Sequence, residues 1–332
     1  MSEQLTQNDA ERRKVNADTW HAAGFTGAGV TVVCIDKRST PHGHMADYAE
    51  SPLLDDGTVG HGTNVAQCVH AFAPDARVIL VQSNESGRQW IRDHAADIDV
   101  INISMSAGRP LAEHSYGFLE ATGIPVVCAA GNDDKSRVSY PSRFPWTISV
   151  GAYEYSEDYE TIANYSNGGD RLDCVAPTDI YVKNSGGRAF RFNGTSAAAP
   201  AASGLLACYV QWRRKYGLSR LTAEGARQFI RENSEPIEGY EYGSGLFCLP
   251  AEIPKAPEKD GGENNPKEDE DMPGKEPKEF TDIDEEFWAY DAIQECAEAG
   301  LIGGYDDGTF RPGETLTRAQ FCAIMAKYMA KD

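Results

Sequence analysis

The chain has 332 residues, which is enough for one large domain and a second, small one. Acidic residues outnumber basic ones by 51 to 31, which gives a formal net charge of −20. This charge disfavours partners that are themselves polyanions, so we expect no binding to nucleic acid. No apolar run approaches the length that spans a bilayer, so we expect no membrane insertion.

We expect no secretory signal at the start of this sequence, because residues 1–5 lead into charged, helix-compatible sequence without an apolar core. On this ground the sequence predicts a cytoplasmic protein. Its eight cysteines agree with a reducing setting rather than with a disulfide framework. Five of them fall in segments predicted to be core strands or helices, where free thiols act as small apolar side chains: Cys34, Cys68, Cys128, Cys174 and Cys208.

A carboxylate and an imidazole open the series of candidate functional residues. Residues 30–35 form a nearly continuous apolar run, which is typical of a central parallel strand. Asp36 follows directly, at the carboxyl end of that strand, where open α/β sheets place their sites. His61 stands between two glycines and opens residues 64–69, whose apolar positions suit a buried helix.

An amide and a hydroxyl complete the series. Residues 126–130 read as a second buried strand that leads to Asn132, whose amide could donate to an oxyanion. Ser196 lies in the sequence GTSAAAP at the start of a long apolar helix, where backbone N–H groups are unpaired. We expect Pro200 in the first turn of this helix, where it costs little. Taken alone, Ser196 could equally be an ordinary helix cap.

The order Asp36, His61, Asn132, Ser196 resembles that of the subtilisin-like serine endopeptidases, the subtilases, over roughly residues 12–250. Further stretches carry the likeness: residues 23–30, 101–106, 140–152, 163–168 and 175–177. The resemblance implies an α/β fold, namely the subtilisin-like three-layer fold with a mostly parallel central sheet. It also implies hydrolysis of protein or peptide substrates through an acyl-enzyme on Ser196.

In that mechanism His61 takes the proton of the serine, and Asp36 orients the imidazole. Asn132 and the backbone N–H of Ser196 hold the oxyanion. The resemblance further implies that substrate pairs as an added strand with Ser104, Met105 and Ser106, and that Ser139 lies at the floor of the specificity pocket.

The chain departs from the family at several places. Lys37 and Arg38 follow Asp36, where relatives carry small residues, and two cations there could compete for the carboxylate. Residues 71–76 leave no room for the calcium-binding loop that many relatives insert. We therefore expect no strong calcium site there, no other metal site and no cofactor.

The composition changes after Pro250. Residues 251–279 are rich in proline and acidic residues, which predicts a disordered linker between a protease domain at 1–250 and a module at 280–332. Two amphipathic helices with a turn-rich connector are predicted in that module.

The last module resembles a single surface-layer homology (SLH) domain. Residues 280–282, Trp288, residues 304–312 and residues 317–320 carry this likeness. It implies binding to anionic secondary cell-wall polysaccharide, with Asp282, Trp288 and Arg318 as ligand residues. The alternative is a structural helical hairpin in which Arg318 is an ordinary helix residue.

Two hypotheses for the whole chain follow. One is an active endopeptidase that its SLH module tethers to the bacterial cell wall. The other is a catalytically silent protease fold that acts as a binding or regulatory protein at the cell envelope. The module points to the envelope and the N-terminus to the cytoplasm, a conflict that release of the protein from the cell would reconcile.

Overall fold

The structure is a computed structural model that describes residues 8–36, 60–156, 159–184, 186–238, 243–255, 280–283, 290–299, 301–303, 308–311 and 324. The chain divides into two compact units, Met1–Glu258 and Lys259–Asp332. In the described part of the chain, no helix combines the length and the apolar character that a membrane crossing requires.

The larger unit is built around a nine-stranded sheet. Its strands are β1 (Thr31–Asp36), β2 (Arg77–Gln82), β3 (Val100–Ile103), β4 (Val126–Ala129), β5 (Ile148–Ser156), β6 (Tyr159–Ile162), β7 (Cys174–Pro177), β10 (Ser234–Glu235) and β11 (Leu246–Phe247). They lie in the order β10-β11-β7-β5-β4-β3-β1-β2, and β6 pairs with β5. Among the strand pairs of this sheet in the described residues, only β5–β6 and β10–β11 are antiparallel, so the prediction of a mostly parallel sheet is confirmed.

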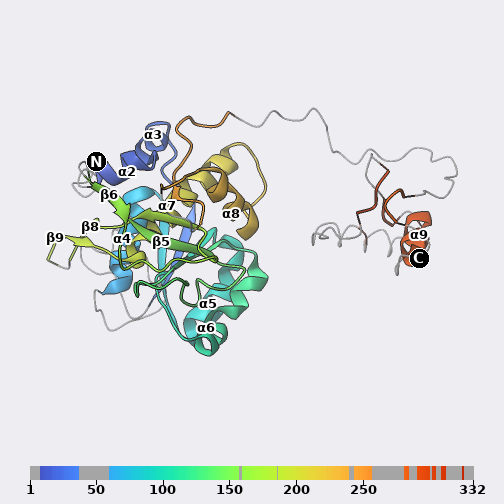
Figure 1. Cartoon of the computed structure of the whole chain (residues 1–332), viewed down its shortest axis with the longest axis horizontal. Helices are drawn as coiled ribbons and strands as arrows, with labels where there is room; N and C mark the ends of the chain where they lie inside the picture. Colours follow the sequence, from blue (N-terminus) through green and yellow to red (C-terminus); the bar gives the residue numbers. More distant parts are fainter. Residues whose placement is uncertain are drawn as a thin grey trace. The chain divides into compact units, whose positions relative to one another are not determined.

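Helices cover both faces of this sheet. They are α2 (Asp9–Lys14), α3 (Ala17–Ala22), α4 (His61–Phe72), α5 (Glu85–His94), α6 (Arg109–Tyr116), α7 (Thr195–Lys215) and α8 (Ala223–Glu232), with 3₁₀ turns at η2 (Ala95–Asp97) and η3 (Gly117–Thr122). One apolar core lies under α4 and α7, and a second lies under α5 and α6. Figure 1 shows α5 and α6 together on the side of the unit away from α2 and α3. The predicted three-layer α/β fold is therefore confirmed.

Strand β1 shows why the middle of a central strand is a continuous apolar run. Val32 and Cys34 belong to the core under α4 and α7, whereas Val33 and Ile35 belong to the core under α5 and α6. Adjacent residues of a strand point to opposite faces, so a strand between two helical layers presents apolar residues to both of them.

The buried cysteines are free thiols, as expected. Cys34, Cys68, Cys128, Cys174 and Cys208 are all buried, and none of the cysteines in the described residues forms a disulfide. Burial raises the pKa of each of these thiols. They therefore stay protonated and pack as small apolar groups.

Helices α4 and α7 approach each other closely. A Cβ atom placed on Gly204 of α7 would lie 2.8 Å from both the Phe72 Cβ atom and the Val69 carbonyl oxygen of α4. Only a glycine fits this contact, because any side chain would push the two helices apart. The starts of both helices carry candidate functional residues.

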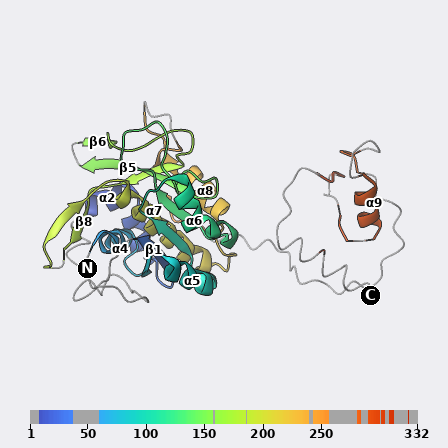
Figure 2. The same ribbon diagram turned by 90° about the horizontal axis from the view of Figure 1, so that it is seen from below.

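A hairpin of β8 (Ile180–Lys183) and β9 (Ala189–Phe192) precedes α7. Its outer edge at β8 is closed by two fully buried side-chain amides. Asn8 donates to the Tyr181 carbonyl (3.1 Å) and accepts from the Tyr181 N–H (2.8 Å). Gln67 of α4 makes the same pair of bonds with Lys183, at 2.9 and 2.7 Å. The hairpin is thereby fixed to α4, and Figure 2 shows the two elements side by side.

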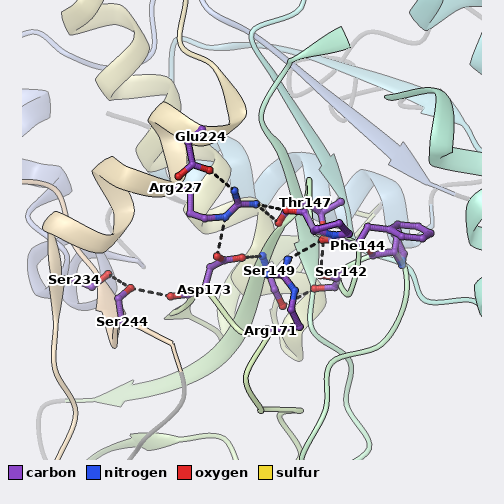
Figure 3. A network of polar contacts seen from close by, with 12 residues as sticks. Ser142, Phe144, Thr147, Ser149, Arg171, Asp173, Glu224, Arg227, Ser234 and Ser244 are labelled. Carbon is purple, nitrogen blue, oxygen red and sulfur yellow. Dashed lines mark hydrogen bonds and ion pairs between the residues drawn. The ribbon is translucent and has the colours of Figure 1, made fainter. Parts of the chain in front are cut away.

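A polar network ties α8 to the start of β5 and to the residue before β7 (Figure 3). Asp173 accepts from the Arg227 Nε atom at 3.0 Å and from the Ser149 N–H at 2.7 Å. Arg227 also donates to the carbonyls of Pro145 (3.0 Å) and Thr147 (2.8 Å). Burial raises the pKa of Asp173 although these donors oppose the shift. The network holds the segment before β5 in place.

In the smaller unit, Phe280, Ile283 and Ile293 form an apolar cluster that includes one side of α9 (Tyr290–Glu298). Phe310 packs against this cluster, with its ring centroid 5.1 Å from that of Phe280. Apolar residues from sequence positions 280 and 310 therefore meet within this unit.

Glu11 of α2 is a buried carboxyl group, and hydrogen bonds and nearby positive charges only partly offset the cost of its burial. It is 3% exposed, and its Oε2 atom has no hydrogen-bond partner among the described residues. Burial raises the pKa of Glu11, and the charges of Arg191 and Arg12 oppose this shift without cancelling it. The folded chain therefore binds more protons than the unfolded chain between the unfolded and folded pKa values of Glu11.

We predict that Glu11→Gln increases stability in a pH-dependent way. The contribution of Glu11 to stability falls as the pH rises through this window, because the charged form is buried. The variant should raise the midpoint of urea unfolding at about pH 7.5, and the gain should shrink as the pH approaches about 4.5. Glu120→Gln, at an exposed position, is the control and should not change the midpoint in this way. A gain that is equal at both pH values would contradict the prediction.

Candidate active site

Asp36 and His61 form a direct hydrogen-bonded pair. Asp36 is the last residue of β1, and its side chain is buried; His61 is the first residue of α4, and its side chain is 39% exposed. The His61 Nδ1 atom lies 2.8 Å from the Asp36 Oδ2 atom. A carboxylate can only accept here, so the proton sits on Nδ1 and Nε2 is left as the basic nitrogen.

The hairpin supports the imidazole from another side. The rings of His61 and Phe192, the last residue of β9, meet edge to face with centroids 5.3 Å apart. This is a favourable geometry for two aromatic rings. His61 is thus oriented by Asp36 and Phe192 while part of its surface stays accessible.

Ser196 lies in the first turn of α7, as the sequence predicts. Its hydroxyl donates to the carbonyl of Ser104 (3.2 Å), and the Ser104 hydroxyl donates to the carbonyl of Ser196 (3.1 Å). Among the described residues, the structure records no hydrogen bond between Ser196 and His61. The Ser196 hydroxyl therefore points to the end of β3 in this conformation.

The expectation for Pro200 is wrong in its position. Helix α7 begins at Thr195, so Pro200 lies inside the helix, in its second turn rather than its first. A proline has no N–H to donate to the carbonyl four residues earlier, which here belongs to Ser196. The hydroxyl of Ser104 bonds to that carbonyl instead. The proline is tolerated because a side chain from β3's end replaces the missing helical donor.

Asn132 is held with one end of its amide fixed. Its Oδ1 atom accepts from both the N–H and the hydroxyl of Thr195, each at 2.9 Å. This leaves the Nδ2 group as the donating end of an otherwise exposed side chain. Gly194, with φ +89°, passes so close that a Cβ atom there would lie 3.1 Å from Asn132 Nδ2. The Asn132 amide and the N-terminus of α7 therefore form one site.

Thr195 is a member of this site to which the sequence analysis assigns no role. It is fully buried, and its hydroxyl also accepts from the N–H of Gly131 (3.1 Å). Thr195 and its partners Gly131 and Asn132 lie 63 or more residues apart in the sequence, so no local sequence pattern predicts the contact. The sequence feature that could have indicated this role is a hydroxyl residue directly before Ser196.

The residues predicted to bind substrate lie around the ends of β3 and β4. Ser104 is buried and bonded to Ser196, whereas Met105 is half-buried and Ser106 exposed. The Ala107 N–H donates to the Tyr140 carbonyl (2.9 Å), which connects this segment to the residue after Ser139. Their roles in substrate binding stay predictions.

In the smaller unit, the Asp282 side chain holds a segment of the backbone by hydrogen bonds. Its two carboxylate oxygens accept from the backbone N–H groups of Phe310 (2.6 Å) and Arg311 (2.7 Å). Trp288 and Arg318, the other predicted glycan-binding residues, lie outside the described residues. Lys37 and Arg38, the departures after Asp36, lie outside them as well.

Two family models match the chain. The model of the Subtilase family matches residues 56–267, and that of the S-layer homology domain matches residues 279–322. Subtilisin E of Bacillus subtilis (strain 168) is 32% identical over 275 residues, which cover 72% of this chain and 69% of that protein. Alkaline elastase YaB of Bacillus sp. (strain YaB) is 29% identical over 225 residues, 60% of this chain and 58% of that protein.

Solved structures agree on the fold. A cold adapted subtilisin-like serine proteinase matches with a TM-score of 0.57 and 22% identity over 68% of this chain and 90% of its own. The prenylagaramide maturation protease PagA matches with a TM-score of 0.57 and 19% identity over 67% of this chain and 89% of its own. The chain therefore belongs to the subtilase family of serine proteases and carries an S-layer homology domain in its C-terminal part.

Proposed function

We propose that the chain is a serine endopeptidase that hydrolyses peptide bonds through an acyl-enzyme on Ser196. The observation that carries the proposal is the 2.8 Å hydrogen bond between Asp36 and His61. It fixes the imidazole tautomer that can accept a proton at Nε2, which is the requirement for a general base in this chemistry.

The reaction begins with a change of hydrogen-bond acceptor. In the structure the Ser196 hydroxyl donates to the Ser104 carbonyl, at 3.2 Å. Rotation about the Cα–Cβ bond of Ser196 carries the hydroxyl to another staggered position, where it can donate to His61. His61 then takes the proton as Ser196 attacks the peptide carbonyl, and Asp36 stabilises the imidazolium.

The negative charge that develops on the carbonyl oxygen meets two donors. One is Nδ2 of Asn132, whose other end is held by Thr195. The other is the N–H of Ser196, which lies in the first turn of α7, where a helix offers it no partner. His61 passes its proton to the leaving amine, and water then hydrolyses the acyl-enzyme with His61 again as base.

Substrate binding is proposed at the ends of β3 and β4. An extended peptide would pair with the backbone of Ser104, Met105 and Ser106 as an added strand. Ser106 is exposed, which supports access to this segment. The specificity pocket would have Ser139 at its floor.

We also propose that the C-terminal module tethers the protease to anionic secondary cell-wall polysaccharide. The match to an S-layer homology domain over residues 279–322 supports this role. Asp282, Trp288 and Arg318 would take part, with Asp282 acting through the backbone segment that it holds rather than through free carboxylate oxygens. In this organisation residues 1–250 are the protease, 251–279 a linker and 280–332 the module.

The first prediction from the proposed function concerns the nucleophile. A fluorophosphonate probe should add once to the parent chain and not at all to Ser196→Ala, because only a serine next to a competent base is phosphonylated at a useful rate. Intact-mass analysis measures the adduct, and circular dichroism checks that both proteins are folded. A folded parent chain without an adduct would favour the alternative function, a silent binding or regulatory protein at the cell envelope.

The second prediction concerns the carboxylate. Asp36→Asn should lower kcat/KM for a peptide substrate by about 10⁴-fold, because an amide NH₂ facing Nδ1 selects the wrong imidazole tautomer. Asp99→Asn is the matched control, since Asp99 is also buried and accepts from the N–H of Thr31, the first residue of β1 (2.8 Å). Steady-state kinetics measure both variants. Equal losses in the two would show that Asp36 acts through stability and not through His61.

A further inference from the structure

Asn167 is a fully buried amide beside the loop that carries Asn132. Its Oδ1 atom accepts from two backbone N–H groups of that loop, those of Asp133 and Lys135, each at 3.0 Å. The first of these donors is the residue directly after Asn132. The Asn167 side-chain oxygen therefore fixes the backbone that follows Asn132, the proposed oxyanion donor.

The Nδ2 end of the same amide fixes the backbone that precedes Asn132. The Nδ2 group of Asn167 donates to the Ala130 carbonyl (3.2 Å) and to the Ser139 hydroxyl (3.2 Å). The backbone N–H of Asn167 adds a bond to the Gly131 carbonyl (2.9 Å). All four hydrogen-bonding positions of the side chain are thus used, on both sides of Asn132.

Gly131 and Asn167 fit together as a pair. Gly131 has φ +109°, a conformation that L side chains rarely adopt, and a Cβ atom there would collide with the Asn167 Nδ2 group. The backbone before Asn132 can approach the amide only because Gly131 has no side chain. The contact therefore depends on a glycine at this position of the turn.

Packing does not hold this loop. Residues 132–137 are all exposed, so burial of apolar side chains contributes little to its position. Its bonds run to the segment around Asn167 instead: Asp134 donates to the Tyr165 carbonyl (2.9 Å), and Gly168 donates to the Lys135 carbonyl (2.8 Å). Among these contacts, only Asn167 reaches both sides of Asn132 with one side chain.

We infer that Asn167 is a positioning residue that aims Asn132 at the oxyanion, an inference that rests on the proposed function. Thr195 fixes the Oδ1 atom of the Asn132 side chain, and Asn167 fixes the backbone from which that side chain projects. An oxyanion donor is effective only when it is held in place before the charge develops. The bond from Asn167 to Ser139 links the same amide to the proposed pocket floor.

A double-mutant cycle tests this role. Asn132→Ala should lower kcat by about 10²- to 10³-fold, the usual cost of one oxyanion donor. Asn167→Ala should lower kcat by about 10- to 100-fold with little change in KM, because a small displacement of the donor weakens transition-state binding. In the Asn132→Ala background, Asn167→Ala should lower kcat less than threefold, roughly the scatter expected of independent sites.

Asn233→Ala is the matched control. Asn233 is likewise a side-chain amide bonded to the backbone, and it donates to the Phe229 carbonyl (2.8 Å) at the end of α8 rather than to the Asn132 loop. It should lower the thermal midpoint as Asn167→Ala does and leave kcat unchanged. All kinetics are measured well below the lowest midpoint. If Asn167→Ala does not fold, Asn167→Asp takes its place, since it keeps the acceptor for Asp133 and Lys135 and loses the donor.

The outcomes separate the two levels of the proposal. A parent chain that neither cleaves peptides nor reacts with the fluorophosphonate overturns the proposed function and this inference with it. An active parent in which the losses from Asn132→Ala and Asn167→Ala multiply overturns the role of Asn167 alone. So does a loss that falls on KM, or a fall in stability with unchanged kcat.

Discussion

The close packing of α4 against α7 is the constraint on which the rest of the protease unit depends. Gly204 lets the backbones approach until only 2.8 Å would separate a Cβ atom from Phe72. The N-terminus of α4 supplies His61, and that of α7 supplies Ser196. Because protein interiors are close-packed, neither helix can slide along the other without opening a void or forcing an overlap. The relative placement of the proposed base and nucleophile is therefore set by apolar contacts outside the site.

Neutral side-chain amides then fix one edge of the β8–β9 hairpin and the exposed loop that carries Asn132. Asn8 and Gln67 close the edge of β8, Asn167 brackets the Asn132 loop, and Asn132 itself is anchored by Thr195. An amide offers two donors and two acceptor sites without a net charge, so it can be buried at lower cost than a carboxylate or an ammonium group. Glu11 shows the contrast, because its buried carboxyl group has a raised pKa and one oxygen without a hydrogen-bond partner in the described part of the chain.

The sequence was informative wherever a local pattern has one physical cause. The apolar run of β1 predicted a strand with Asp36 at its end, and the small residues around His61 and Ser196 predicted helix starts. The sequence did not show in which turn of α7 Pro200 lies. The start of a helix depends on which donors satisfy its backbone carbonyls, and here one of these donors is the distant Ser104 hydroxyl. It also gave no role to Thr195 or Asn167, whose partners are distant in the chain or lie in an exposed loop.

The sheet order explains why these separate pieces meet. β4, β3 and β1 are consecutive neighbours and run parallel, so their carboxyl ends share one edge. Asn132 follows β4, Ser104 follows β3 and Asp36 ends β1. Ser104 stands in the middle and holds Ser196 by two hydrogen bonds. An antiparallel neighbour at any of these positions would send one group to the opposite edge, so the parallel order itself is what allows the carboxylate, the proposed nucleophile and the proposed amide donor to share one site.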